Sequence, residues 1–152
     1  MSAIYIFGPS CSGKSTLGQA LQQRLGAQWT YLDRDQLIES GLCMDSEANK
    51  AIEERIQAIK NGVIVDAQIP WREKKKEEVY CLLLPPLEVL LERDSLRTDR
   101  LERPEQRAFY AKKYVIETHT ILSGIVRENF DVCFNSSQLP IEKMVVKVLQ
   151  FL

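Results

Sequence analysis

Residues Gly8 to Ser15, GPSCSGKS, follow the pattern G-x-x-x-x-G-K-[S/T] of a phosphate-binding loop, or P-loop. The apolar run from Ala3 to Phe7 directly before it predicts a strand that is buried on both faces. Leucines recur at helical spacing from residue 17 to residue 25, and Gly26 ends this pattern. A strand, a glycine-containing loop and a helix in this order predict an α/β fold whose first loop holds phosphate groups.

The residue types in the loop indicate how it would hold a nucleotide. Gly8 and Gly13 permit backbone conformations and a close approach that a Cβ would block, so that N–H groups turn inward around phosphate oxygens. We expect Lys14 to reach the β- and γ-phosphates, Ser15 to ligate Mg²⁺ and Thr16 to support the α-phosphate. The other residues predicted to bind the nucleotide here are Pro9, Ser10, Cys11 and Ser12. The predicted cofactors are ATP and Mg²⁺, and the alternative is a glycine-rich turn without a ligand.

Further apolar runs alternate with helical patterns along the chain. Strands are expected at residues 29–32, 63–65, 79–84 and 131–134, and helices at 14–25, near 37–41, at 46–61, from 87, at 108–123 and at 140–152. This alternation predicts a three-layer α/β fold, a parallel sheet with helices on both faces. The 152 residues contain no linker or repeat, so one domain spanning residues 1–152 is expected. The charged segment 71–78 is predicted to be a solvated surface.

The composition argues against several classes of protein. Lys and Arg number 20 against 21 Asp and Glu, a balance that disfavours a protein binding duplex nucleic acid through a strong overall basic charge. The cysteines, at positions 11, 43, 81 and 133, are scattered and predict neither a zinc site nor a disulfide framework. No apolar stretch reaches the roughly 18 residues of a membrane span, and the first residues lack a basic leader, so a cytoplasmic location is expected.

Acidic residues follow the second and third predicted strands. Ligands of open α/β sheets bind beyond the carboxyl ends of the strands, so Asp33, Asp35 and Asp66 are expected to converge there. Asp66 is the predicted support for Mg²⁺, although a polar residue that merely closes a strand is the alternative. Asp35 is the predicted base that accepts a proton from an incoming hydroxyl, against the alternative of capping a helix over residues 36–40. Asp33 is the second candidate for the base.

Three arginines follow the fourth predicted strand. Arg93, Arg97 and Arg100 stand at i, i+4 and i+7, which on a helix places all three on one face. We predict a lid at about residues 93–107 that closes over the nucleotide, with Arg93 binding it and with Arg97 and Arg100 neutralising charge during the reaction. The alternative is a surface helix with salt bridges to neighbouring acids.

In chain order, the segments GPSCSGKST, LDRDQLIES, GVIVDAQIP, LERDSLRTDR and NFDVCFNSS resemble the chloramphenicol phosphotransferase-like group of small P-loop kinases. Asp35 before Leu37-Ile38-Glu39 matches the segment that carries the proposed base of that group, and Arg93, Arg97 and Asp99-Arg100 resemble its lid. Shikimate kinases, with an acidic D-x-D after the second strand, are similar too. The resemblance implies a nucleoside-kinase-like fold with strand order 2-3-1-4-5, ATP and Mg²⁺ as cofactors, and a small hydroxylated acceptor.

These features favour one functional hypothesis over two others. No Asn-Lys-x-Asp motif for guanine is present, and the chain is too short for the added regions of large ATPases. The leading hypothesis is an ATP-dependent phosphotransferase that acts on a hydroxyl of a small-molecule acceptor. The alternatives are a kinase of nucleotides or polynucleotide ends, and a nucleotide-binding regulatory module with little turnover.

Overall fold

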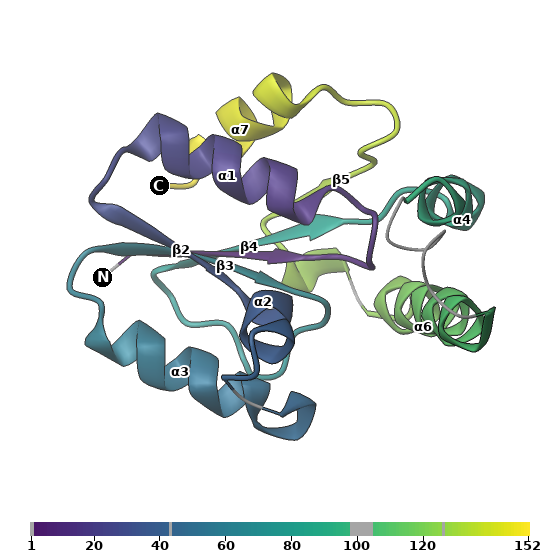
Figure 1. The fold of residues 1–152 in the computed structure, drawn as a ribbon. Helices are drawn as coiled ribbons and strands as arrows, with labels where there is room; N and C mark the ends of the chain where they lie inside the picture. The colour runs from purple at the N-terminus through teal and green to yellow at the C-terminus, as the bar shows by residue number, and fades with distance from the viewer. Residues whose placement is uncertain (1, 43, 98–104, 126) are drawn as a thin grey trace.

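The computed structural model describes residues 2–42, 44–97, 105–125 and 127–152, and five parallel strands form its sheet. The strands are β1 (Ala3–Phe7), β2 (Trp29–Asp33), β3 (Gly62–Ala67), β4 (Glu78–Leu83) and β5 (Val132–Phe134). Their order in the sheet is β2-β3-β1-β4-β5, so the first strand of the five is the central one (Figure 1). The predicted parallel sheet and its strand order are confirmed.

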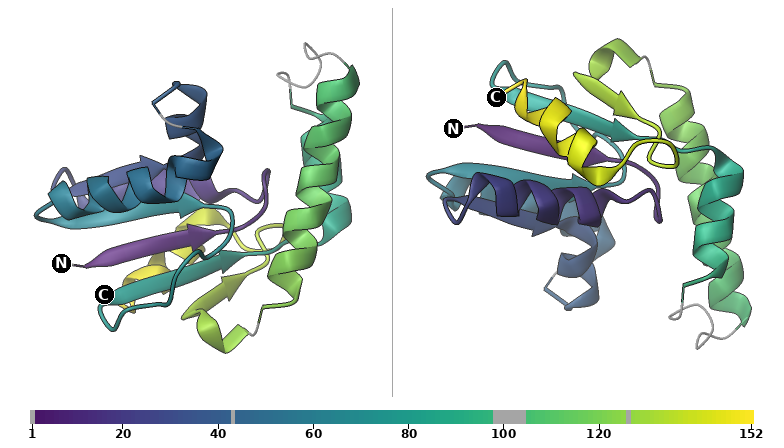
Figure 2. Two further views of the ribbon diagram at one scale, coloured as in Figure 1. Left: turned by 90° about the horizontal axis from the view of Figure 1, so that it is seen from below. Right: turned by 90° about the horizontal axis from the view of Figure 1, so that it is seen from above.

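Helices cover both faces of this sheet. In Figure 1, α1 (Lys14–Leu25) and α7 (Ile141–Leu149) lie on one face, and α2 (Arg34–Glu39) and α3 (Ala48–Ala58) lie on the other. Figure 2 shows α4 (Leu87–Ser95) and α6 (Glu105–Ser123) side by side beyond the carboxyl ends of the strands. Two short 3-10 turns, η1 (Asp45–Glu47) and η2 (Arg127–Asn129), complete the described elements. No helix in the described ranges has the length and apolar character needed to cross a membrane.

Alternation along β1 divides the core into two layers. Tyr5 and Phe7 belong to the layer that also holds residues of α2 and α3, whereas Ile4 and Ile6 belong to the layer beneath α1 and α7. All four side chains are at most 1% exposed. Successive side chains of a strand point to opposite faces, and a strand buried on both faces therefore reads as a continuous apolar run.

The connection from β3 to β4 contains no helix. Because β3 and β4 lie on either side of β1, residues 68–77 must cross β1 to join them. Parallel strands are usually joined by a dozen or more residues that include a helix. Here Trp71 takes the place of a helix, since its ring packs edge-on against Tyr5 at 5.8 Å and Phe7 at 6.3 Å between ring centroids. We call residues 68–77 the strap.

The strap corrects one prediction from the sequence. Residues 73–77 are exposed as expected, but Arg72 is only part-exposed and bonds Glu53 Oε1 through Nε at 2.7 Å. Its Nη2 bonds Glu78 Oε1 at 2.5 Å, and its guanidinium carbon lies 5.0 Å from the centroid of the Tyr5 ring. The prediction of a solvated surface is therefore wrong for Arg72 and for Glu78, the buried first residue of β4. The ion pair with Glu53 holds the strap against α3.

Gly18 of α1 allows a close contact with Tyr31 of β2, whose hydroxyl bonds Asp66. A Cβ on Gly18 would lie 2.3 Å from Cε2 of Tyr31, so the tyrosine ring lies directly against the helix backbone. We expect Gly18→Ala to destabilise the fold by about 1 to 3 kcal/mol through overpacking, although alanine favours helices by up to about 1 kcal/mol over glycine. Urea unfolding measures this change.

The matched control is Gly124→Ala, because a Cβ there meets its nearest neighbour, the Ile121 carbonyl oxygen, at an ordinary 3.5 Å. A Gly18→Ala protein as stable as the wild type would show that Tyr31 moves aside without cost.

Candidate functional site

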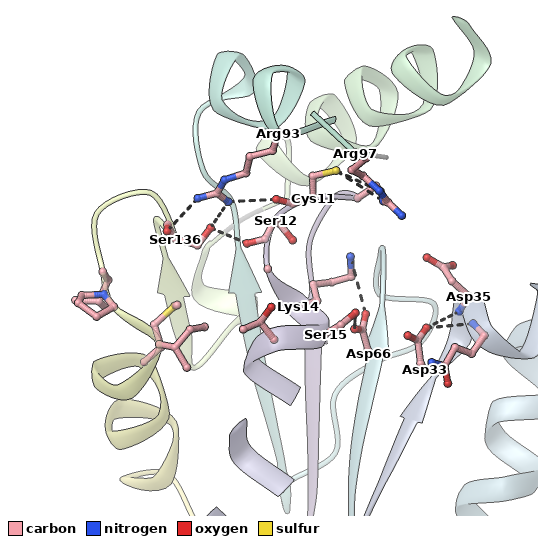
Figure 3. Close-up of a pocket in the computed structure, with 18 residues that line it drawn as sticks. Cys11, Ser12, Lys14, Ser15, Asp33, Asp35, Asp66, Arg93, Arg97 and Ser136 are labelled. Atoms are coloured by element: carbon pink, nitrogen blue, oxygen red, sulfur yellow. Dashed lines mark hydrogen bonds and ion pairs between the residues drawn. The ribbon is translucent and has the colours of Figure 1, made fainter. Parts of the chain in front are cut away.

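A pocket of about 770 Å³ lies at the carboxyl ends of the strands. The P-loop lies between two walls, with carboxylates from β2, α2 and β3 on one side and residues from the β5–α7 connection and the start of α7 on the other (Figure 3). The predicted site residues that line it are Ser10, Cys11, Ser12, Gly13, Lys14, Ser15, Thr16, Asp33, Asp35, Asp66, Arg93 and Arg97. The fold therefore brings together residues that are up to 87 positions apart in sequence, as the bond from Arg97 to Ser10 shows.

The two glycines of the P-loop are required for different reasons. A Cβ on Gly8 would lie 2.6 Å from the Leu83 carbonyl oxygen and 2.5 Å from Ser12 Oγ, so only glycine fits between the strands. Gly13 has φ 97° at the start of α1, in the left-handed region that side chains disfavour. Cys11 also has a positive φ, 67°, which is uncommon for a residue with a side chain. The loop thus holds a tight conformation directly before a helix N-terminus, where anions bind.

The ammonium group of Lys14 lies inside the loop. The side chain is 7% exposed, and its Nζ donates to the Pro9 carbonyl oxygen at 3.0 Å. The same Nζ lies 3.9 Å from Asp66 Oδ1. A lysine in this place is a positive charge that phosphate oxygens in the loop can approach.

Asp66 is a buried carboxylate that two hydroxyl groups contact. Ser15 Oγ donates to its Oδ2 at 3.1 Å, and the Tyr31 hydroxyl donates to the same oxygen at 2.9 Å. Burial raises the pKa of Asp66 to about 6, although Lys14 acts in the opposite direction. The hydroxyl and carboxylate oxygens fit Mg²⁺, which binds proteins through one or two carboxylates together with substrate phosphates. The bond from Tyr31 to Asp66 was not predicted from the sequence, because a strand pattern does not show which group a tyrosine hydroxyl contacts.

The structure distinguishes the two acids at the junction of β2 and α2. Asp33 Oδ1 accepts from the backbone N–H groups of Asp35 at 2.9 Å and Gln36 at 3.2 Å, so Asp33 is the N-cap of α2. The alternative that Asp35 is the cap is therefore wrong. The Asp35 carboxylate instead accepts from Gln68 Nε2 at 3.4 Å and lines the pocket. Its oxygens are not engaged by the first turn of the helix, as those of a cap would be.

Gln68 and Thr118 of α6 do not line the pocket, but they connect to its Asp35 through hydrogen bonds that the sequence did not reveal. Gln68 Oε1 accepts from Thr118 Oγ1 of α6 at 3.4 Å while its Nε2 donates to Asp35. Tyr114 of α6 faces the same region: burial raises its pKa, and the nearby Asp45 carboxylate adds to this effect. A single glutamine after a strand carries no recognisable signal. Gln68 can bond both Asp35 of α2 and Thr118 of α6 only because the fold places α6 opposite α2.

The arginines are arranged differently from the prediction. Helix α4 ends at Ser95, so Arg93 and Arg97 do not belong to one continuous helical face. Arg93 Nη1 donates to the Cys11 carbonyl oxygen at 3.1 Å, and Arg97 Nη1 donates to Ser10 Oγ at 3.1 Å. Arg100 falls among residues 98–104, outside the described residues, as does much of the predicted lid at 93–107.

The wall opposite the carboxylates is largely apolar. It is formed by Ser136, Leu139, Pro140, Ile141 and Met144. No motif marks these positions, and only the proline before a helical pattern hinted at where α7 begins. An apolar wall beside a phosphate-binding loop suits a flat heteroaromatic ring.

Solved structures with the same fold include three kinases. A shikimate kinase from Acinetobacter baumannii in complex with shikimate is 19% identical, with 99% of this chain and 92% of that chain covered at a TM-score of 0.67. A gluconokinase from Sinorhizobium meliloti 1021 is 22% identical, with 99% and 90% covered at 0.62. A deoxyadenosine kinase from M. mycoides with bound dATP is 14% identical, with 97% of each chain covered at 0.57. The chain has the fold of P-loop kinases.

No profile of a known protein family matches the sequence, and no curated protein matches it.

Proposed function

We propose that this protein is an ATP-dependent phosphotransferase that moves the γ-phosphate of MgATP to a hydroxyl of a small-molecule acceptor. The observation that carries the proposal is one pocket lined by Lys14 of the P-loop, the Ser15–Asp66 pair and the Asp35 carboxylate. Structural neighbours support it, because they include kinases named for shikimate, gluconate and deoxyadenosine. A site that only bound a triphosphate and its metal ion through Ser15 and Asp66 would not need the Asp35 carboxylate as well.

The nucleotide would lie across the P-loop with its base toward the apolar wall. Leu139, Pro140 and Met144 offer that wall to the adenine, while Lys14 and the backbone N–H groups of the loop receive the phosphates. Ser15 and Asp66 would hold Mg²⁺, and the Tyr31 hydroxyl fixes the orientation of the Asp66 carboxylate. When bound, the metal ion supplies positive charge that offsets the charge of the β- and γ-phosphates.

The acceptor would lie between α2 and α6, next to Asp35. As the acceptor oxygen bonds to the γ-phosphorus and the bond to the β-phosphate oxygen breaks, Asp35 takes the hydroxyl proton and ADP leaves. Gln68 donates to Asp35 and so orients the carboxylate. Arg97 lies at the rim of the pocket and, with Arg100, is proposed to neutralise charge on the transferred group.

The test is a screen with γ-labelled ATP over sugars, hydroxy acids, nucleosides and amino alcohols. We expect at least one class to gain the label with matching formation of ADP, and Lys14→Ala to abolish the transfer. ADP formation that no acceptor stimulates would contradict the proposal and favour a nucleotide-binding regulatory module. Stimulation by nucleosides or nucleic-acid ends alone would favour the second kinase hypothesis, which the structural likeness to a deoxyadenosine kinase makes worth including.

A further inference from the structure

Two consecutive carbonyl oxygens of the P-loop are held by groups from outside the loop. The Cys11 oxygen accepts from Arg93 Nη1 at 3.1 Å, and the Ser12 oxygen accepts from Ser136 Oγ at 2.6 Å. The two outer groups are also bonded to each other, because Arg93 Nη1 donates to Ser136 Oγ at 3.2 Å and Nη2 donates to the Ser136 carbonyl oxygen at 3.3 Å. Figure 3 shows Arg93 and Ser136 beside Cys11 and Ser12 of the loop, with these bonds drawn as dashed lines.

These bonds act on the direction of N–H groups. The described peptide bonds include no cis bond, and in a trans peptide the carbonyl oxygen and the next N–H point in opposite directions. Bonds that hold the Cys11 and Ser12 oxygens toward Arg93 and Ser136 therefore fix the N–H groups of Ser12 and Gly13 in the opposite direction. The Ser12 N–H donates to the Pro9 carbonyl oxygen at 3.2 Å, so of these two groups it is the Gly13 N–H that a phosphate oxygen can approach. The orientation of such N–H groups decides whether a loop attracts or repels an anion.

The loop needs outside support to keep this conformation. Cys11 and Gly13 both have a positive φ, 67° and 97°, on either side of Ser12. A non-glycine residue with a positive φ is uncommon and persists where surrounding contacts hold it. The contacts here come from α4 and from the segment before α7, which lie 82 and 124 positions away from the loop residues they bond.

We propose that Arg93 and Ser136 form a carbonyl clamp, two side chains that hold the Cys11 and Ser12 oxygens outward and so orient the loop for the phosphates of a nucleotide. The clamp rests on the proposed function, because it presupposes that the P-loop binds a polyphosphate. It makes both side chains positioning residues that act through the loop backbone. The role of Arg93 then differs from the direct nucleotide contact expected of a lid arginine.

The test compares a nucleotide with a polyphosphate that has no base. Ser136→Ala removes the Oγ atom, and we expect titration calorimetry to show binding of both ATP and inorganic tripolyphosphate weakened by roughly three- to tenfold, the range for losing one hydrogen bond. Equal weakening places the effect in the loop, since tripolyphosphate cannot contact the apolar wall through a base. Ser136→Thr keeps a hydroxyl at this position and is expected to restore both affinities.

Ser137→Ala is the matched control, because Ser137 Oγ bonds Asn135 Oδ1 and the residue is exposed beside the clamp. Its affinities for both ligands should equal those of the wild type, and all three variants should remain fully folded at the temperature of the titrations. Unchanged binding in Ser136→Ala, or a loss confined to ATP, would overturn the clamp and leave the proposed function intact. A wild-type protein that binds neither ligand would contradict the proposed function itself.

Discussion

An Asp35→Asn variant is expected to bind MgATP as the wild type does but to transfer phosphate about 100- to 10,000-fold more slowly, the range that general base catalysis contributes. Asparagine keeps an oxygen that can accept from Gln68 Nε2, which lies 3.4 Å from the carboxylate in the wild type. It cannot take the proton of an acceptor hydroxyl. Calorimetric titration with MgATP and measurement of kcat with the acceptor found in the screen give the two quantities.

Asp33→Asn is the control that separates the two acids. Asparagine is as good an N-cap as aspartate, so the bonds from Asp35 N and Gln36 N to the cap should survive. We expect this variant to lose less than about tenfold in kcat, because its side chain serves the helix. A large loss in Asp33→Asn together with near-normal turnover in Asp35→Asn would reassign the base to Asp33.

Asp66→Asn is expected to have opposite effects on ligand binding and on the stability of the ligand-free protein. Even residues that only support a metal ligand change metal affinity by roughly 10- to 100-fold, so loss of the carboxylate should weaken Mg²⁺-dependent ATP binding at least about 100-fold. Burial raises the pKa of Asp66 from 3.8 to about 6, with Lys14 already lowering it. A difference of this size corresponds to roughly 2 to 3 kcal/mol, by which the ionised carboxylate destabilises the fold.

The stability gain of this variant should depend on pH. With a folded pKa near 6 and an ordinary value of 3.8, the folded wild type holds more protons than the unfolded chain between these values. Wild-type stability is therefore reduced as pH rises through this window, whereas the asparagine variant lacks the effect. The variant should be more stable above about pH 6 and should lose its advantage near pH 4.

Urea unfolding from pH 4 to pH 8 measures this difference. Asp45→Asn serves as the control, because the side chain of Asp45 is 72% exposed and no such gain is expected. A variant at Asp66 that is less stable than the wild type at pH 8 would show that the carboxylate stabilises the ligand-free pocket.

The sequence predicted best the parts of the fold that depend on local pattern. The P-loop lies between the predicted strand and helix because glycine, lysine and serine at fixed spacing satisfy one backbone geometry. Asp66 lies at the end of β3 beside Ser15, as expected from the rule that strand ends converge at one edge of the sheet. Both predictions needed only neighbouring residues and a general rule of topology.

The sequence failed where a side chain bonds a partner far along the chain. It also failed locally at Asp33 and Asp35, because the helix begins at Arg34, which makes Asp33 its N-cap and places Asp35 in its first turn. Arg72 lies in a run of charges that looked solvated, yet it bonds Glu53, 19 positions earlier. Ser136 meets the P-loop 124 positions from its partner. Such pairs depend on how the connections between strands run, which residue patterns do not encode.

The central place of β1 also affects the order in which the protein can assemble. Its partners β3 and β4 begin at Gly62 and Glu78, so β1 emerges from a ribosome well before either neighbour exists. Until then its apolar side chains are exposed, and so are the backbone N–H and C=O groups along both edges of the strand, a condition that favours misfolding and aggregation. The strand that carries the P-loop therefore gains its neighbours only after these later segments have been made, and the phosphate-binding site forms only once the segments that supply Arg93 and Ser136 have followed.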